Sequence, residues 1–213
     1  MKQIIKVVII TAVFSLTSHA NVQHFKNING AVNSFIQALQ TKDKKTLETL
    51  FTKKYRDILQ VKKLTSADIR AFLDAYKREH RLVSFDAKHI YIAVGVKEWT
   101  FPIPLFKSKE GWFYDLDSGI ENMLTRKIGR NELAVIKALA DNKTLQELQE
   151  SELSNIYTFV NEHERIFAMP KVYAQTGIMS FYRNKIGEIF EANMTLQESF
   201  KQINNFYLLQ EKQ

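Results

Sequence analysis

The chain has 213 residues, a formal net charge of +7 at neutral pH and no cysteine. The absence of cysteine excludes disulfides, a cysteine nucleophile and lipoprotein anchoring, so the fold must be held together by its core alone. Only seven glycines occur, and none of them belongs to a phosphate-cradling loop or to a serine-hydrolase elbow.

The first residues have the pattern of an export signal. Lys2 and Lys6 precede an apolar run over 7–16, and a small-x-small cleavage sequence ends at Ala20. This run is about half as long as the roughly 20 apolar residues that span a bilayer. We therefore expect a signal peptide over residues 1–20 and a periplasmic or secreted mature protein without a transmembrane segment.

Residues 28–80 have the periodicity of amphipathic helices. Apolar residues recur at spacings of three and four within 31–39 and within 69–76, which predicts a helical first part of the mature chain. Between Lys42 and Arg81 there are twelve Lys and Arg against six Asp and Glu. For an exported protein this excess disfavours nucleic acid as a partner and favours an anionic envelope component or a periplasmic protein. The alternative is a set of solvated helix faces.

After residue 80 the chain becomes rich in β-branched and aromatic residues, which are typical of strands. The pattern predicts two strands and then a hairpin, with runs over 81–85, 89–96, 99–107 and 112–117. Pro102 and Pro104 lie in the third run, and a proline cannot donate to a sheet ladder. We therefore expect this strand at a sheet edge, either as protection against aggregation or as an edge shaped for a ligand.

The rest of the chain is predicted as helices, a second hairpin and a last helix. Ser118 opens a helix with a capping box, and the pattern leaves open whether Gly129 separates two helices or lies inside one. A charged helix follows over 144–167, and Thr195 opens the last helix. The expected segments are a hairpin with helices over 81–167 and a C-terminal hairpin with a helix over 171–210.

Together these elements predict the α+β class. We expect one domain over 21–213, with a curved antiparallel sheet and helices packed on one of its faces. Helices followed by long strands and a hairpin also occur in cone-shaped cystatin-like and ketosteroid-isomerase-like domains, a comparison that rests on analogy alone.

Several motifs carry a family resemblance. An F-P-I-P strand, a G-W-x-[FY]-D strand and an R-x-I-G-R-N-E-L helix resemble the exported bacterial domain-of-unknown-function family numbered 2950. The matching positions are Phe101 to Pro104, Gly111, Trp112, Tyr114, Asp115, Arg126 and Ile128 to Leu133. Residues 173–194 resemble the C-terminal strand pair of the family. The resemblance implies export and an α+β fold, and it implies no reaction.

The chain also departs from the family pattern. Members usually have a longer stretch rich in glycine and tyrosine, which the short charged segment near 144–167 replaces here, and the closing aspartate of the family is absent near Ala192 and Asn193. A site that this stretch builds in other members would be missing from this protein.

The polar residues form no recognisable catalytic or metal motif, because the histidines of the mature chain are scattered and lack metal-ligand spacing. We therefore predict no catalytic residue, metal or cofactor. Arg126 and Arg130 share a helix face and suit a carboxylate or phosphate, although an internal ion pair with Asp115 or Glu121 is the alternative. The predicted ligand-binding residues are Trp99, Trp112, Arg126, Arg130 and Glu132.

These observations lead to two hypotheses about function. The first is a non-enzymatic exported module that binds envelope material or a periplasmic protein, and it rests on export, local basic charge and the lack of catalytic motifs. The alternative is a small-molecule-binding or hydrolytic domain with a pocket between sheet and helices near Trp99, Trp112 and Arg130.

Overall fold

The computed structural model describes residues 22–59, 65–193 and 206–209. The predicted signal peptide and the start of the predicted last helix lie outside these residues. The chain divides into two compact units, Met1–Leu116 and Asp117–Gln213, and each unit is described by itself. The single domain expected over 21–213 stays a prediction.

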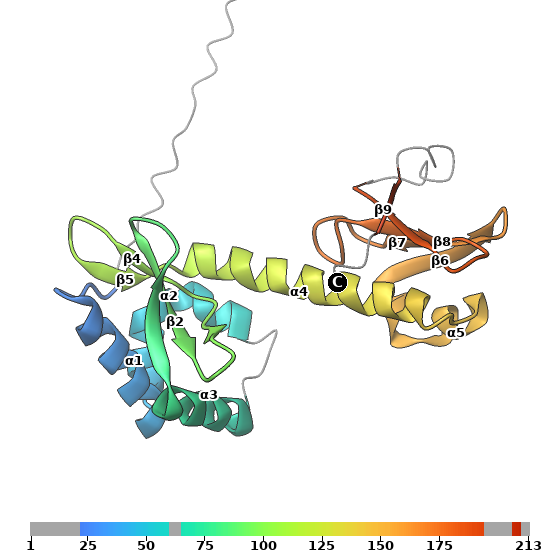
Figure 1. Ribbon diagram of the computed structural model, residues 1–213. Coiled ribbons are helices and arrows are strands. Elements are labelled where there is room, and N and C mark those ends of the chain that lie inside the picture. Colours follow the sequence, from blue (N-terminus) through green and yellow to red (C-terminus); the bar gives the residue numbers. More distant parts are fainter. Residues whose placement is uncertain (1–21, 60–64, 194–205, 210–213) are drawn as a thin grey trace, which may run out of the picture. The chain divides into compact units, whose positions relative to one another are not determined.

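The first unit combines helices with an antiparallel sheet (Figure 1). Its described elements are α1 (Ile28–Thr41), α2 (Lys44–Leu59), α3 (Ser66–Arg78), β1 (His80–Ser84), β2 (His89–Val94), β3 (Trp99–Thr100), β4 (Leu105–Lys107) and β5 (Trp112–Tyr114). The helices predicted between residues 28 and 80 are confirmed. Their starts follow from local chemistry, since Asn27 caps α1 and Thr65 forms a capping box with Asp68 at α3.

The sheet of the first unit has the order β1-β2-β4-β5, and β3 also pairs with β2. Helices α1 and α2 contact β5, while α3 contacts β1 and β2. Leu105 and Tyr114 are cross-strand partners, and the Tyr114 ring packs 5.5 Å from Phe35 and 5.1 Å from Phe51 between ring centroids. Aromatic residues of two helices and a strand thus form much of this core.

The prediction of one edge strand over 99–107 is wrong. The chain forms β3 and β4 with an irregular segment between them, and β4 lies between β2 and β5. Phe101 N–H donates to Ile92 O at 2.8 Å, and Pro104 O accepts from Asp115 N at 2.9 Å. The missing donors of Pro102 and Pro104 therefore fall where the ladder is already interrupted, so the prolines separate two short strands instead of marking an edge.

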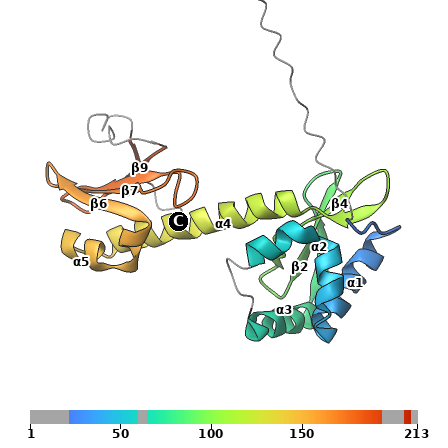
Figure 2. The same ribbon diagram turned by 180° about the vertical axis from the view of Figure 1, so that it is seen from behind.

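The second unit combines helices with another antiparallel sheet (Figures 1 and 2). Its described elements are α4 (Leu116–Ala140, which begins one residue before the unit boundary), α5 (Leu145–Glu150), the 3-10 helix η1 (Glu152–Asn155), β6 (Tyr157–Glu162), β7 (Arg165–Pro170), β8 (Ser180–Arg183), β9 (Ile189–Ala192) and β10 (Tyr207–Leu208). The sheet order is β10-β9-β8-β7-β6.

Both faces of this second sheet are apolar. One face meets α4 and α5 in a cluster that includes Val135, Leu139, Leu148, Tyr157 and Phe181. The other carries Phe167, Tyr182, Ala192 and Phe206. Because strand side chains alternate between faces, neighbouring residues such as Phe181 and Tyr182 belong to different clusters.

The α+β class is confirmed, and the strands form two antiparallel sheets instead of one. The helix predicted over 144–167 is wrong beyond Asn155, since the chain turns there into the β6–β7 hairpin. The C-terminal hairpin is confirmed as β8 and β9. Gly129 lies inside the continuous helix α4, and Tyr207, predicted on the last helix, belongs to β10.

Candidate functional site

The five residues that the sequence nominates belong to different units. Trp99 and Trp112 are on β3 and β5 of the first unit, and the three polar residues, Arg126, Arg130 and Glu132, are on α4 in the second. Arg130 is exposed and Arg126 is half-buried. A common site for all five stays a prediction.

Glu132 has a structural partner, namely the backbone that leads into β8. Its Oε1 accepts hydrogen bonds from Ile178 N at 2.7 Å and from Met179 N at 2.9 Å. The neighbouring Asn131 donates from Nδ2 to Thr176 O at 2.8 Å. A carboxylate that accepts two backbone N–H groups is well satisfied, so this part of the R-N-E-L motif holds the segment 176–179 against α4.

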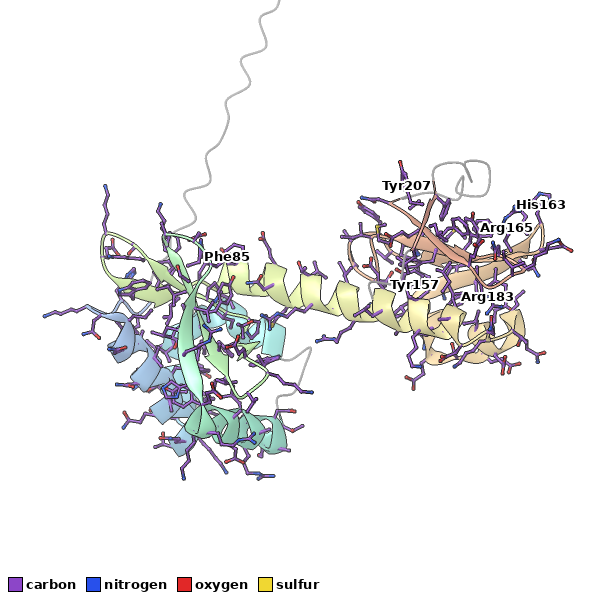
Figure 3. The ribbon with its side chains drawn as sticks, viewed as in Figure 1. Phe85, Tyr157, His163, Arg165, Arg183 and Tyr207 are labelled. Carbon is purple, nitrogen blue, oxygen red and sulfur yellow. The ribbon has the colours of Figure 1, made fainter. Side chains whose placement is uncertain are left out.

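Tyr157 of β6, labelled in Figure 3, contacts the same segment. Its hydroxyl donates to Met179 O at 2.9 Å, and a Cβ built on Gly177 would lie 2.0 Å from the hydroxyl oxygen. Burial raises the pKa of Tyr157, with a smaller contribution from the charge of Glu132. The requirement for glycine at position 177 therefore comes from packing.

Trp112 also has a structural role. Its backbone exchanges two hydrogen bonds of 2.8 Å with Phe25, which adds an isolated antiparallel bridge to β5. A Cβ on Gly111 would lie 2.5 Å from Phe25 O. The Lys107 ammonium lies 5.8 Å from the centroid of the Trp112 ring, within cation–π distance.

Trp99 is the more exposed of the two predicted tryptophans, with half of its surface exposed (50%), whereas Trp112 is half-buried. The Trp99 ring contacts Phe72 of α3 edge-on at 6.2 Å. Further along α3, the ring of Tyr76 stacks on the ring of His80, the first residue of β1, with centroids 3.8 Å apart. We call the surface around these rings the Trp99 surface, and its residues are Tyr76, Lys77, Arg78, His80, Val96, Lys97 and Trp99.

The Trp99 surface is assembled by contacts between α3 and the β2–β3 turn. Gly95 N–H donates to Glu79 O at 2.9 Å, and a Cβ on Gly95 would lie 3.5 Å from the Ala75 Cβ. This contact brings the exposed end of α3 next to Val96, which is 82% exposed at the tip of the turn. An aliphatic and an aromatic side chain thus stand beside the last turn of a basic helix.

Cations outnumber anions on and around the Trp99 surface. Within 76–81 and 95–99 the chain has four Lys and Arg against two Glu. Arg81 Nη2 lies 2.5 Å from Glu98 Oε2, which neutralises the acidic side chain of the β2–β3 turn. In the part of the chain that the structure describes, the cations of this surface without an ion-pair partner are Lys77, Arg78 and Lys97, against Glu79, so the surface has a net positive charge.

A cluster that the sequence analysis missed lies at the β1–β2 turn. Asp86 Oδ1 accepts from Lys88 N and His89 N, both at 2.7 Å, and Oδ2 lies 2.7 Å from His89 Nδ1. Since a carboxylate only accepts, Nδ1 carries the proton. His89 Nε2 lies 3.6 Å from Asp115 Oδ2. The signal in the sequence was the D-x-x-H spacing, but Asp115 reaches His89 only through the pairing of β4 with its neighbours.

This histidine cluster joins the β1–β2 turn to the end of β5. The Lys88 N–H, and then the His89 side chain and N–H, lower the pKa of Asp86 to about 2. Among the side chains that the structure describes, no group of three or more acidic or histidine residues is arranged to hold a metal ion. Because the hydrogen bonds of Asp86 close the β1–β2 turn, we assign the cluster to the stability of the first unit.

The fold and these contacts define an α+β protein with an exposed aromatic and basic surface on its first unit. The chain belongs to the family described as Protein of unknown function (DUF2950), whose sequence model matches residues 22–155. No curated protein and no solved structure matches the chain. The matched range contains all five nominated residues and ends before β6, so the resemblance of residues 173–194 to the family stays a prediction.

Proposed function

We propose that this protein is exported to the bacterial periplasm, or secreted, and works there as a non-enzymatic binding module for anionic envelope material. The observation that carries the proposal is the Trp99 surface. There the half-exposed Trp99 follows a turn with the exposed Val96 and Lys97, and Gly95 of this turn bonds to the end of α3, whose last turn has Lys77 and Arg78. Family membership leaves the function open, so the proposal rests on this surface and on the leader.

The chemistry of the surface explains why the partner is anionic. Lys and Arg side chains attract phosphate and carboxylate groups, while a tryptophan offers an apolar ring together with an N–H donor. Among the described residues, no helix has the length and apolar character that crossing a membrane requires. We propose binding through the Trp99 surface because its cations and the Trp99 ring are exposed.

Sedimentation of the mature protein with isolated cell envelopes tests the binding proposal. We expect a bound fraction that falls as ionic strength rises, because salt screens exposed charges. The variant K77Q/K97Q removes two cations from the Trp99 surface and should bind more weakly. The control K137Q/K185Q removes two cations from the exposed ion pairs with Asp141 and Glu164 in the second unit.

The two double variants have the same net charge, so their comparison separates the surface from total charge. Equal losses of binding would contradict a specific role of the Trp99 surface, and salt-independent binding would contradict an electrostatic contribution. A third variant, R126A/R130A, tests the arginine pair on α4. A loss confined to that variant would move the site from the first unit to the second.

Export is tested by expressing the full chain and sequencing the N-terminus of the protein recovered from the periplasm or medium. We expect a mature chain that starts at Asn21. A product in the cytoplasm that retains its first 20 residues would contradict the proposal, since the predicted leader occupies residues 1–20.

A further inference from the structure

We infer that the anionic material is the surface of a lipid bilayer, and that Val96 and Trp99 enter its interfacial layer. The inference rests on the proposed function and names its partner. The observation behind it is the exposure of an aliphatic side chain, since Val96 is 82% exposed at the tip of the β2–β3 turn. A soluble polyanion gives valine no apolar environment, whereas the acyl boundary of a bilayer does.

Trp99 has the chemistry of an interfacial anchor. Tryptophan is enriched at membrane–water interfaces, where its ring lies among apolar groups and its N–H remains hydrated. The edge-on contact with Phe72 holds one side of the Trp99 ring, and half of the side chain remains exposed. The ring is therefore fixed in place before any partner binds, which lowers the entropy cost of binding.

The β2–β3 turn satisfies its own polar groups. Glu98 N–H donates to Gly95 O at 2.8 Å, and Gly95 N–H donates to Glu79 O at 2.9 Å. The carboxylate of Glu98 is paired with Arg81. These contacts reduce the cost of moving the turn into a less polar layer, because unpaired polar groups are the expensive ones to bury.

The cations complete the match to an anionic headgroup layer. Lys97 is in the same turn as Val96, and Lys77 and Arg78 form the basic last turn of α3. Long basic side chains place their charge at the level of lipid phosphates while their stems cover apolar surface. Of the two acidic residues next to them in the sequence, Glu98 is paired with Arg81, and Glu79 is outnumbered by the three cations.

The presence of two tryptophans in the chain allows a direct test. The variant W112F leaves Trp99 as the only tryptophan, and W99F leaves Trp112. Each mature variant is mixed with phosphatidylglycerol vesicles, with phosphatidylcholine vesicles and with soluble dextran sulfate. We expect phosphatidylglycerol vesicles to move the emission of W112F to shorter wavelength and to reduce its quenching by acrylamide, and to leave W99F unchanged.

Two substitutions test the parts played by charge and apolar contact. K97Q should weaken vesicle binding about fivefold, the effect of one cation near an anionic surface. V96S should also weaken binding, and the control is I186S, which changes another largely exposed aliphatic residue, in the second unit. Equal effects of V96S and I186S would contradict the insertion of Val96.

The outcomes distinguish the inference from the proposed function. Binding to dextran sulfate without an emission shift on vesicles would overturn the bilayer inference and leave a module for soluble polyanions. An equal shift on phosphatidylcholine would show that charge does not select the surface, and it would also overturn the inference. Binding to neither vesicles nor dextran sulfate, with no sedimentation on envelopes, would overturn both proposals. If W112F fails to fold, the difference between the wild type and W99F gives the signal of Trp99.

Discussion

Asp86 organises the turn between β1 and β2 by accepting hydrogen bonds from two backbone N–H groups and from His89. These donors lower its pKa from 3.8 to about 2. A carboxyl whose pKa is lower in the folded state stabilises the fold above its unfolded pKa, and this contribution disappears as pH falls through the folded pKa. The contribution of Asp86 is therefore complete at neutral pH and is lost between about pH 4 and pH 2.

The variant D86N tests this pH dependence, because asparagine keeps an acceptor oxygen and removes the titration. We expect D86N to be less stable than the wild type at pH 7, and the difference to shrink as pH falls toward 2. Urea unfolding at a series of pH values, followed by tryptophan emission, measures the difference. A difference that stays constant down to pH 2 would show that the charge of Asp86 does not contribute to stability.

Gly177 and Gly129 differ in the space that is available for an added Cβ, so their alanine variants can be compared. A Cβ at position 177 would meet the Tyr157 hydroxyl at 2.0 Å, whereas a Cβ at position 129 meets nothing within 4 Å. We expect G177A to destabilise the second unit by about 1–3 kcal/mol through overpacking. We expect G129A to stabilise it by about 0.5–1 kcal/mol, since alanine has the better helix propensity. Urea unfolding by far-UV circular dichroism gives both values, and changes of the same sign would contradict the packing argument.

The β6–β7 hairpin turns at two residues with left-handed backbone, His163 with φ 51° and Glu164 with φ 60°, between the paired Glu162 and Arg165 (Figure 3). Two-residue hairpin loops favour asparagine and glycine at such positions. We expect H163N to raise stability by about 0.5 kcal/mol, because asparagine tolerates positive φ better than histidine. Thermal unfolding measures the change. E162N places the same residue in β6 and should give no gain, so equal gains would contradict the turn argument.

This hairpin was not predicted from the sequence, which indicated a helix over 144–167 instead. Apolar residues over 145–160 fit a helical stripe, and a turn made of histidine and glutamate gives no turn signal. The helices of the first unit were predictable because their caps and apolar faces are local. The split at Pro102 and Pro104 was not predictable, because it depends on the hydrogen bonds of the segment with Ile92 of β2 and with Asp115, which follows β5.

The long-range contacts of the candidate site were also not predictable from the sequence. Trp99 could be nominated from its aromatic pattern alone. Its neighbours on the Trp99 surface depend on the docking of α3 against the β2–β3 turn, which joins Glu79 to Gly95. Likewise, the contact of His89 with Asp115 depends on the pairing of β4 with both neighbouring strands. Long-range contacts of this kind leave no periodic signal in the sequence.

At the scale of the whole molecule, each unit has its own sheet and its own apolar core. Aromatic rings around Phe35 and Tyr114 fill the first, and the cluster that includes Leu139 and Phe181 fills part of the second. A unit with its own core can unfold in its own transition. Both tryptophans belong to the first unit, so tryptophan emission reports on that unit, whereas far-UV circular dichroism reports on both.

We therefore expect the two units to respond separately to substitutions that overpack one of them. G177A should lower the urea concentration at the midpoint of one phase of the circular dichroism transition. It should leave the midpoint measured by tryptophan emission unchanged. G111A should lower the urea midpoint measured by tryptophan emission, because its Cβ would lie 2.5 Å from Phe25 O at a φ of 131°. It should leave the circular dichroism phase of the second unit unchanged. The single domain expected from the sequence makes the opposite prediction, since one cooperative core would shift both probes together in both variants.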